Sequence, residues 1–179
     1  FRAMGKEIDS TRAEYLIFLC GGLMTGLVSE IEKVGAYAKG RTITREDIDA
    51  VATPVLDAVA FQMTDAMAEK DFDRAAGILG TLLKMQEPPV RLLAVIGRQM
   101  RQLYSARLVL DAGKETSRLM ELWGMRSSYP AQLLLRSAGR FSAKWCRKAV
   151  RLCCEADLAM KSSQGDSEDI LKLLILCLA

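Results

Sequence analysis

The stretch Glu87–Asp111, EPPVRLLAVIGRQMRQLYSARLVLD, indicates the fold class of the chain. It opens with Pro88 and Pro89, and proline suits the first turn of a helix because its φ is nearly helical and its missing donor is not needed there. Apolar residues then recur at steps of three and four, the spacing of one helix face. The sequence therefore predicts a helix of roughly 35 Å at the centre of an all-helical domain. Its apolar positions are Leu93, Ile96, Met100, Leu103 and Tyr104.

The same helix carries a narrow polar stripe. A helix with a broad apolar surface and a thin polar stripe normally packs against neighbours on most of its sides. We expect Arg98 and Arg101 to hold neighbouring helices or a neighbouring subunit in register, so both are candidates for a subunit interface. The stripe consists of Arg91, Arg98, Arg101, Gln102 and Ser105.

The rest of the sequence also shows helical spacing, and no segment alternates as a half-buried strand would. A break at Ala52-Thr53-Pro54 divides the chain, because the residue before a proline is biased away from helix. We therefore expect a small helical module over residues 1–52 and a helical-bundle domain over residues 53–179. In the first module, Ser10 or Thr11 and then Thr44 are expected to cap helices.

The last segment, Glu168 to Leu178, is apolar nearly all round. A helix of this kind needs cover on most sides, either from the core or from a neighbouring subunit. Ile170 and Leu174 are the residues of this segment that we expect at a subunit interface.

Composition excludes several classes of function. Half of the 179 residues are hydrophobic and the net charge is +3, so the balance alone does not indicate nucleic-acid binding. Histidine and asparagine are both absent, which excludes Ser-His-Asp and Cys-His-Asn catalysis and histidine metal sites. The five cysteines show no CxxC spacing, which indicates reduced thiols in a cytoplasmic protein. We expect no cofactor, no metal and no membrane contact, and a preceding segment upstream of Phe1.

A basic stripe extends from Arg140 to Arg151, and no acidic residue interrupts it. Such residues either form the solvated face of a helix or contact phosphates without sequence specificity, and both interpretations stay open. Trp145 is expected in the core. The candidate DNA contacts are Arg140, Lys144, Arg147, Lys148 and Arg151, together with Lys161 farther along.

Several segments, in this order and spacing, resemble the delta subunit of the bacterial DNA polymerase III clamp loader. Residues 66–103 resemble the start of the C-terminal domain of that family, and Glu155-Ala-Asp157-Leu-Ala-Met-Lys161 resembles its late E-x-D-x-x-x-K signature. Upstream, Leu27 to Tyr37 and Ile43 to Ile48 are similar to the end of its second domain. The resemblance covers essentially the whole chain.

This resemblance implies three domains in the family: an AAA+-like nucleotide-binding fold, a helical lid and a collar. Residues 1–52 would be the lid and residues 53–179 the collar, or oligomerisation domain, whereas the domain that grips the sliding clamp would be missing. The resemblance implies that this piece has no intrinsic activity. The piece would belong to a DNA-directed DNA polymerase holoenzyme, and that holoenzyme is a nucleotidyltransferase. The implied partners are other loader subunits of the gamma/tau and delta-prime types, and primer–template DNA in the assembled complex. The loop from Lys161 to Gly165 would approach that DNA with Gln164 and no aromatic side chain.

Two functions therefore remain open. The first is a scaffold within the replicative clamp loader, used in DNA replication. The second is a free-standing helical nucleic-acid-binding protein that uses the stripe from Arg140 to Arg151. A helical enzyme is disfavoured, because histidine is absent and because Glu155 and Asp157, two residues apart on a helix, point away from each other.

Overall fold

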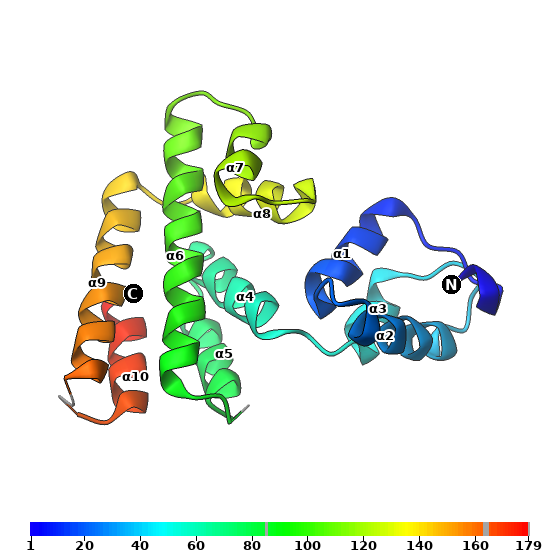
Figure 1. The fold of residues 1–179 in the computed structure, drawn as a ribbon, viewed down its shortest axis with the longest axis horizontal. Helices are drawn as coiled ribbons and strands as arrows, with labels where there is room; N and C mark the ends of the chain where they lie inside the picture. Colours follow the sequence, from blue (N-terminus) through cyan, green and yellow to red (C-terminus); the bar gives the residue numbers. More distant parts are fainter. Residues whose placement is uncertain (85, 163–164, 179) are drawn as a thin grey trace. The chain divides into compact units, whose positions relative to one another are not determined.

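A computed structural model of the chain describes residues 1–84, 86–162 and 165–178 (Figure 1). Helices dominate these residues; none of them lies in a strand, and Glu7 and Thr42 form an isolated parallel bridge. The all-α class predicted from the sequence is confirmed. The chain divides into two compact units, unit 1 from Phe1 to Ala58 and unit 2 from Val59 to Ala179.

Unit 1 is a small helical module. Its N-terminal segment is fastened beside the end of the helix Met24–Tyr37 (α2), where Lys6 Nζ donates to the carbonyl oxygens of Ala38 at 2.5 Å and Gly40 at 2.8 Å. The buried core includes the side chains of Leu16, Val34 and Ile48. Its elements are η1 (Arg2–Met4), α1 (Ser10–Cys20), α2 (Met24–Tyr37) and α3 (Arg45–Val51).

Side-chain caps explain where two helices of unit 1 begin. Asp9 caps α1 by accepting from the backbone N–H of Arg12 at 2.8 Å, so the predicted cap at Ser10 or Thr11 is wrong by one or two residues. Thr44 caps α3 as predicted. Its Oγ1 accepts from the backbone N–H of Asp47 at 3.2 Å, and the Asp47 carboxylate accepts from the backbone N–H of Thr44 at 2.9 Å. This reciprocal pair is a capping box, which satisfies donors that the helix start leaves unpaired.

Unit 2 is a helical bundle arranged around α6 (Figure 1). Helices α7, α8, α9 and α10 all pack against α6, which confirms the central helix predicted from its apolar spacing. Four of the five predicted apolar positions are buried, and Tyr104 is half-buried. The elements are α4 (Leu56–Ala68), which begins at the end of unit 1, α5 (Phe72–Lys84), α6 (Pro89–Asp111), α7 (Thr116–Trp123), α8 (Ser128–Ala138), α9 (Ala143–Lys161) and α10 (Ser167–Leu178).

Helices α9 and α10 position the surfaces of interest. Helix α9 packs along α6, and α10 packs against α5, α6 and α9 (Figure 1). One face of α10 is buried in the core of unit 2, through Leu171, Leu174, Ile175 and Leu178. The other face of α10 and the outer face of α9 remain open to contact.

Candidate assembly and nucleic-acid surfaces of unit 2

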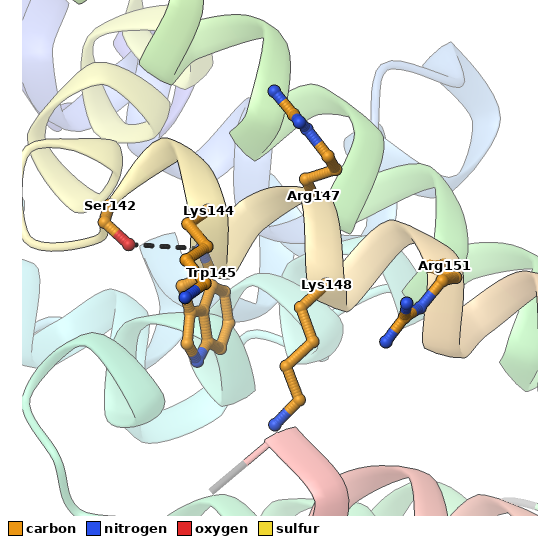
Figure 2. Close-up of a pocket in the computed structure, with 6 residues that line it drawn as sticks. All are labelled: Ser142, Lys144, Trp145, Arg147, Lys148 and Arg151. Carbon is orange, nitrogen blue, oxygen red and sulfur yellow. Dashed lines mark hydrogen bonds between the residues drawn. The ribbon is translucent and has the colours of Figure 1, made fainter.

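The predicted basic stripe lies on α9 and on the turn that precedes it. Lys144, Lys148 and Arg151 stand at helical positions i, i+4 and i+7, which share one side of the helix. Figure 2 shows Lys148 and Arg151 pointing to the same side as Trp145, whereas Arg147 points to the opposite side. A surface hollow of about 450 Å³ lies here, lined by Ser142, Lys144, Trp145, Arg147, Lys148 and Arg151.

Several cations of the stripe already have partners within the chain. Arg140 forms an ion pair with Glu69 at 3.3 Å, and Arg151 forms one with Glu155 at 3.4 Å. Exposed pairs of this kind are worth about 0.2–1 kcal/mol at most. They leave the arginines free to exchange these carboxylates for phosphate oxygens.

Two residues of α9 hold the end of α10. Lys148 Nζ donates to the carbonyl oxygen of Cys177 at 2.7 Å, and Trp145 Nε1 donates to that of Leu178 at 3.3 Å. Carbonyls at a helix C-terminus lack intrahelical partners, and cationic groups near them also interact favourably with the helix dipole. The start of α9 is thereby tied to the end of α10.

Trp145, which was expected in the core, lines this hollow instead. The structure places its ring half-buried, stacked on Phe141 with centroids 4.0 Å apart and an interplanar angle of 19°. Ser142 caps α9 by accepting from the backbone N–H of Trp145 at 3.1 Å. The spacing of Phe141 and Trp145, four residues apart beside a row of cations, is the sequence signal that could have indicated this stacked aromatic pair at the surface.

Lys161 lies at the far end of α9, about 25 Å from Lys144 along the helix axis. The two are therefore not brought together, and Lys161 forms an ion pair with Asp157 at 2.6 Å. No ion pair joins Lys144 to another of the described residues. Ser163 and Gln164, in the loop predicted to approach DNA, lie outside the described residues.

The polar stripe of α6 is also on the surface. Arg98 and Arg101, the predicted interface cations, are both exposed. Arg91 forms an ion pair with Glu87 at 2.6 Å, one turn earlier. Ser105 Oγ donates to the carbonyl oxygen of Arg101 at 3.0 Å, so this hydroxyl is used within the helix.

The two predicted interface residues of α10 have different environments. Ile170 is half-buried, whereas Leu174 is only 4% exposed and packs inside unit 2. The apolar side chains that α10 presents to its surroundings are Leu173, 60% exposed, and Leu176, 72% exposed. A partner would therefore meet Leu173 and Leu176, while Leu174 supports the core beneath them.

All five cysteines are free thiols. Burial raises the pKa of the Cys146 thiol to about 11 and that of the Cys153 thiol to about 12. Both stay protonated at neutral pH and behave as small apolar core residues.

Within residues 1–84, 86–162 and 165–178, no three potential metal ligands gather into one group. None of the helices described there has the length and apolar character needed to cross a membrane.

Comparisons with known proteins bear on the whole chain. A family model of the C-terminal domain of the DNA polymerase III delta subunit matches residues 57–178. The chain is similar to the probable DNA polymerase III subunit delta of Aquifex aeolicus (strain VF5), with 25% identity over 131 residues, 72% of this chain and 37% of that protein. It is also similar to the DNA polymerase III subunit delta of Bacillus subtilis (strain 168), with 24% identity over 175 residues, 96% of this chain and 49% of that protein. The chain thus spans half or less of the length of these relatives.

The fold is similar to that of a solved structure, the Bacillus subtilis DNA clamp loader delta protein (YqeN). The TM-score is 0.80 at 22% sequence identity, and the match covers 99% of this chain and 52% of that one. The residues matched by the family model coincide closely with unit 2, from Val59 to Ala179. The chain therefore belongs to the family of DNA polymerase III delta subunits, and its residues 57–178 form the C-terminal domain of that family.

Proposed function

We propose that this chain is a non-catalytic part of the delta subunit of a replicative DNA polymerase III clamp loader. It would contribute the collar through which the loader assembles, and the loader would place the sliding clamp on primed DNA. The observation that carries this proposal is the family match over residues 57–178, which falls on the compact helical unit 2. Unit 1 would be the lid of an AAA+-like module, and we expect the protein in the cytoplasm.

The proposal assigns no reaction to this chain. Nucleotidyl transfer would belong to the DNA-directed DNA polymerase holoenzyme of which the loader is a component. The part of the delta relatives that this chain does not span would contact the clamp. The direct partners of this chain would be loader subunits of the gamma/tau and delta-prime types.

The exposed face of α10 supports an assembly role. Leu173 and Leu176 lie one turn apart and are 60% and 72% exposed. Burial of a leucine side chain contributes about 1.5–3 kcal/mol, so covering both would favour association. Arg98 and Arg101 on the exposed stripe of α6 are proposed as further interface residues, with Ile170 at the edge of the α10 face.

Primer–template DNA in the assembled loader is the second proposed contact. Its candidates remain Arg140, Lys144, Arg147, Lys148, Arg151 and Lys161. The alternative of a free-standing nucleic-acid-binding protein is not supported by the family match.

The test of assembly uses the chain together with purified gamma/tau-type and delta-prime-type subunits. We expect a stable complex that elutes earlier than any component in size-exclusion chromatography. If the chain elutes alone, yet binds DNA in a salt-dependent manner, the assembly role is wrong and the free-standing alternative gains support.

A further inference from the structure

We propose that the hollow beside the start of α9 binds single-stranded DNA, with one base stacked on Trp145 and neighbouring phosphates contacting Lys144, Lys148 and Arg151. This inference deepens the proposed contact with DNA and rests on it, but it does not require assembly of the loader. It adds a class of ligand, a binding mode and an aromatic residue that the basic stripe alone does not contain.

The Trp145 ring is held ready for stacking. Phe141 covers one ring face at 4.0 Å between centroids, and the indole N–H is fixed by the carbonyl oxygen of Leu178 at 3.3 Å. Trp145 also lines the hollow (Figure 2). Because the ring is already ordered, little conformational freedom is lost when a base stacks on it. Aromatic platforms of this kind bind the bases of single strands without selecting among them.

The cations lie in a row beside this ring. From Lys144 through Lys148 to Arg151 the row extends about 10 Å along the helix, enough to follow about two or three nucleotides of a strand. The N-terminus of α9 lies at the same end and adds the positive end of its dipole. Arg151 can turn toward phosphate because its exposed ion pair with Glu155 is weak. Lys148 can keep its bond to the Cys177 carbonyl, since an ammonium group has three donors and two of them remain for phosphate.

The chemistry of the lining favours a nucleic-acid strand over a peptide. Ser142 Oγ already accepts from the backbone N–H of Trp145, and Trp145 Nε1 already donates to Leu178. What remains available is positive charge, one hydroxyl group and an aromatic ring, whereas an extended peptide is bound largely through main-chain hydrogen bonds. Duplex DNA offers phosphates, but its paired bases are stacked on one another and do not reach the ring. A single strand presents both groups together.

The first experiment uses Trp145 as its own reporter. The chain contains two tryptophans, Trp123 and Trp145, so the substitution Trp123→Phe leaves Trp145 as the only indole. Titration with a short single-stranded thymidine oligonucleotide should quench its fluorescence in a saturable way. Three phosphate contacts predict a loss of affinity of roughly twentyfold between 50 and 200 mM salt. Absence of quenching, or equal quenching by a duplex of the same length, would overturn the proposal.

A second set of variants tests the residues, with binding followed by the anisotropy of a labelled oligonucleotide. Lys144→Glu and Arg151→Glu should each weaken binding at least tenfold, whereas Lys114→Glu, an equal charge change at an exposed site after α6, should not. Trp145→Leu should weaken binding in a variant whose circular dichroism and thermal midpoint show that it is folded. If Lys114→Glu is as harmful as Lys144→Glu, or if polyglutamate competes as well as DNA, the site is not a single-strand site. Loss of this site would leave co-elution with loader subunits unchanged, so the two proposals fail separately.

Discussion

Gly97 of α6 and Cys153 of α9 lie where these two helices approach each other closely. A Cβ placed on Gly97 would be 3.7 Å from the Cβ of Cys153 and 3.3 Å from a guanidinium nitrogen of Arg101. The first contact is an ordinary van der Waals distance, and the second involves the mobile end of an exposed side chain. The seam between the two helices thus has room for one methyl group and for little more.

We predict opposite effects of two substitutions at Gly97. Gly97→Ala should raise the free energy of unfolding by about 0.5–1 kcal/mol, because alanine is the better helix former. Gly97→Leu should lower it by about 1–3 kcal/mol, because the larger side chain overpacks the seam. Urea unfolding measures both. As a control, Gly80→Ala on α5, where an added Cβ meets no other atom within 4 Å, should show only the gain. Equal stability of the alanine and leucine variants at position 97 would contradict close packing here.

The exposed leucines of α10 provide the test of the assembly surface. The double substitution Leu173→Asp and Leu176→Asp should abolish co-elution with the loader subunits, because an interface cannot bury two carboxylates that have no partners. The isolated chain should keep its thermal midpoint, since both side chains are exposed. The matched control is Leu122→Asp, at a leucine on α7 that is 53% exposed. Leu174→Asp, in contrast, should unfold unit 2. Normal co-elution of the double variant would show that α10 is not the interface.

The capping box of α3 predicts both a mutational and a pH effect. Thr44→Ala should lower the stability of unit 1 by about 1 kcal/mol at neutral pH, because the helix loses its cap. Hydrogen bonds from the backbone and side chain of Thr44 lower the pKa of the Asp47 carboxyl below its ordinary value of 3.8. A lowered folded-state pKa contributes stability that is complete above that ordinary value and is lost as the pH falls through the folded-state pKa.

The measurement is thermal unfolding of the wild type and of Asp47→Asn between pH 2 and pH 7. We expect the difference between the two proteins to be constant above about pH 5 and to shrink in the acid range. A difference that grows on acidification would contradict the cap.

Gln99 lies in α6 with only 7% of its surface exposed, and its Nε2 has no hydrogen-bond partner among the described residues. A buried donor without a partner costs about 1–3 kcal/mol. Gln99→Met keeps the length of the side chain and removes the donor, so urea unfolding should show a stabilised protein. The control Gln102→Met, at a half-buried position three residues later, should change stability by less than about 0.5 kcal/mol. A destabilised Gln99→Met variant would mean that the amide is hydrogen-bonded.

The cysteines should differ in reactivity according to burial. Cys154 and Cys177 are exposed, whereas Cys146 and Cys153 are buried and have raised pKa values of about 11 and about 12. Since the thiolate is the nucleophile, iodoacetamide at pH 8 should modify Cys154 and Cys177 first. Peptide mass spectrometry at increasing times distinguishes neighbouring Cys153 from Cys154. Rapid labelling of Cys153 in the native protein would show that the seam between α6 and α9 opens.

Much of the fold could be predicted because its signals are local. The two prolines and the apolar spacing after Glu87 predict a long helix whichever neighbours it has, and Thr44 caps α3 through atoms three residues away. The order and spacing of short motifs also indicated the delta family, to which the chain belongs. The cap of α1 was placed one or two residues too late, because Asp9, Ser10 and Thr11 are all suitable capping residues.

The surfaces depended on the tertiary structure. A helix such as α10, apolar on nearly every side, does not reveal by its own sequence which leucines its neighbours cover. Packing against α5, α6 and α9 decided that Leu174 is buried and that Leu173 and Leu176 are exposed. In the same way, the spacing of the α9 cations was visible in the sequence. The sequence did not show that Lys148 and Trp145 hold the end of α10. These contacts join residues about thirty positions apart, which only the folded chain brings together.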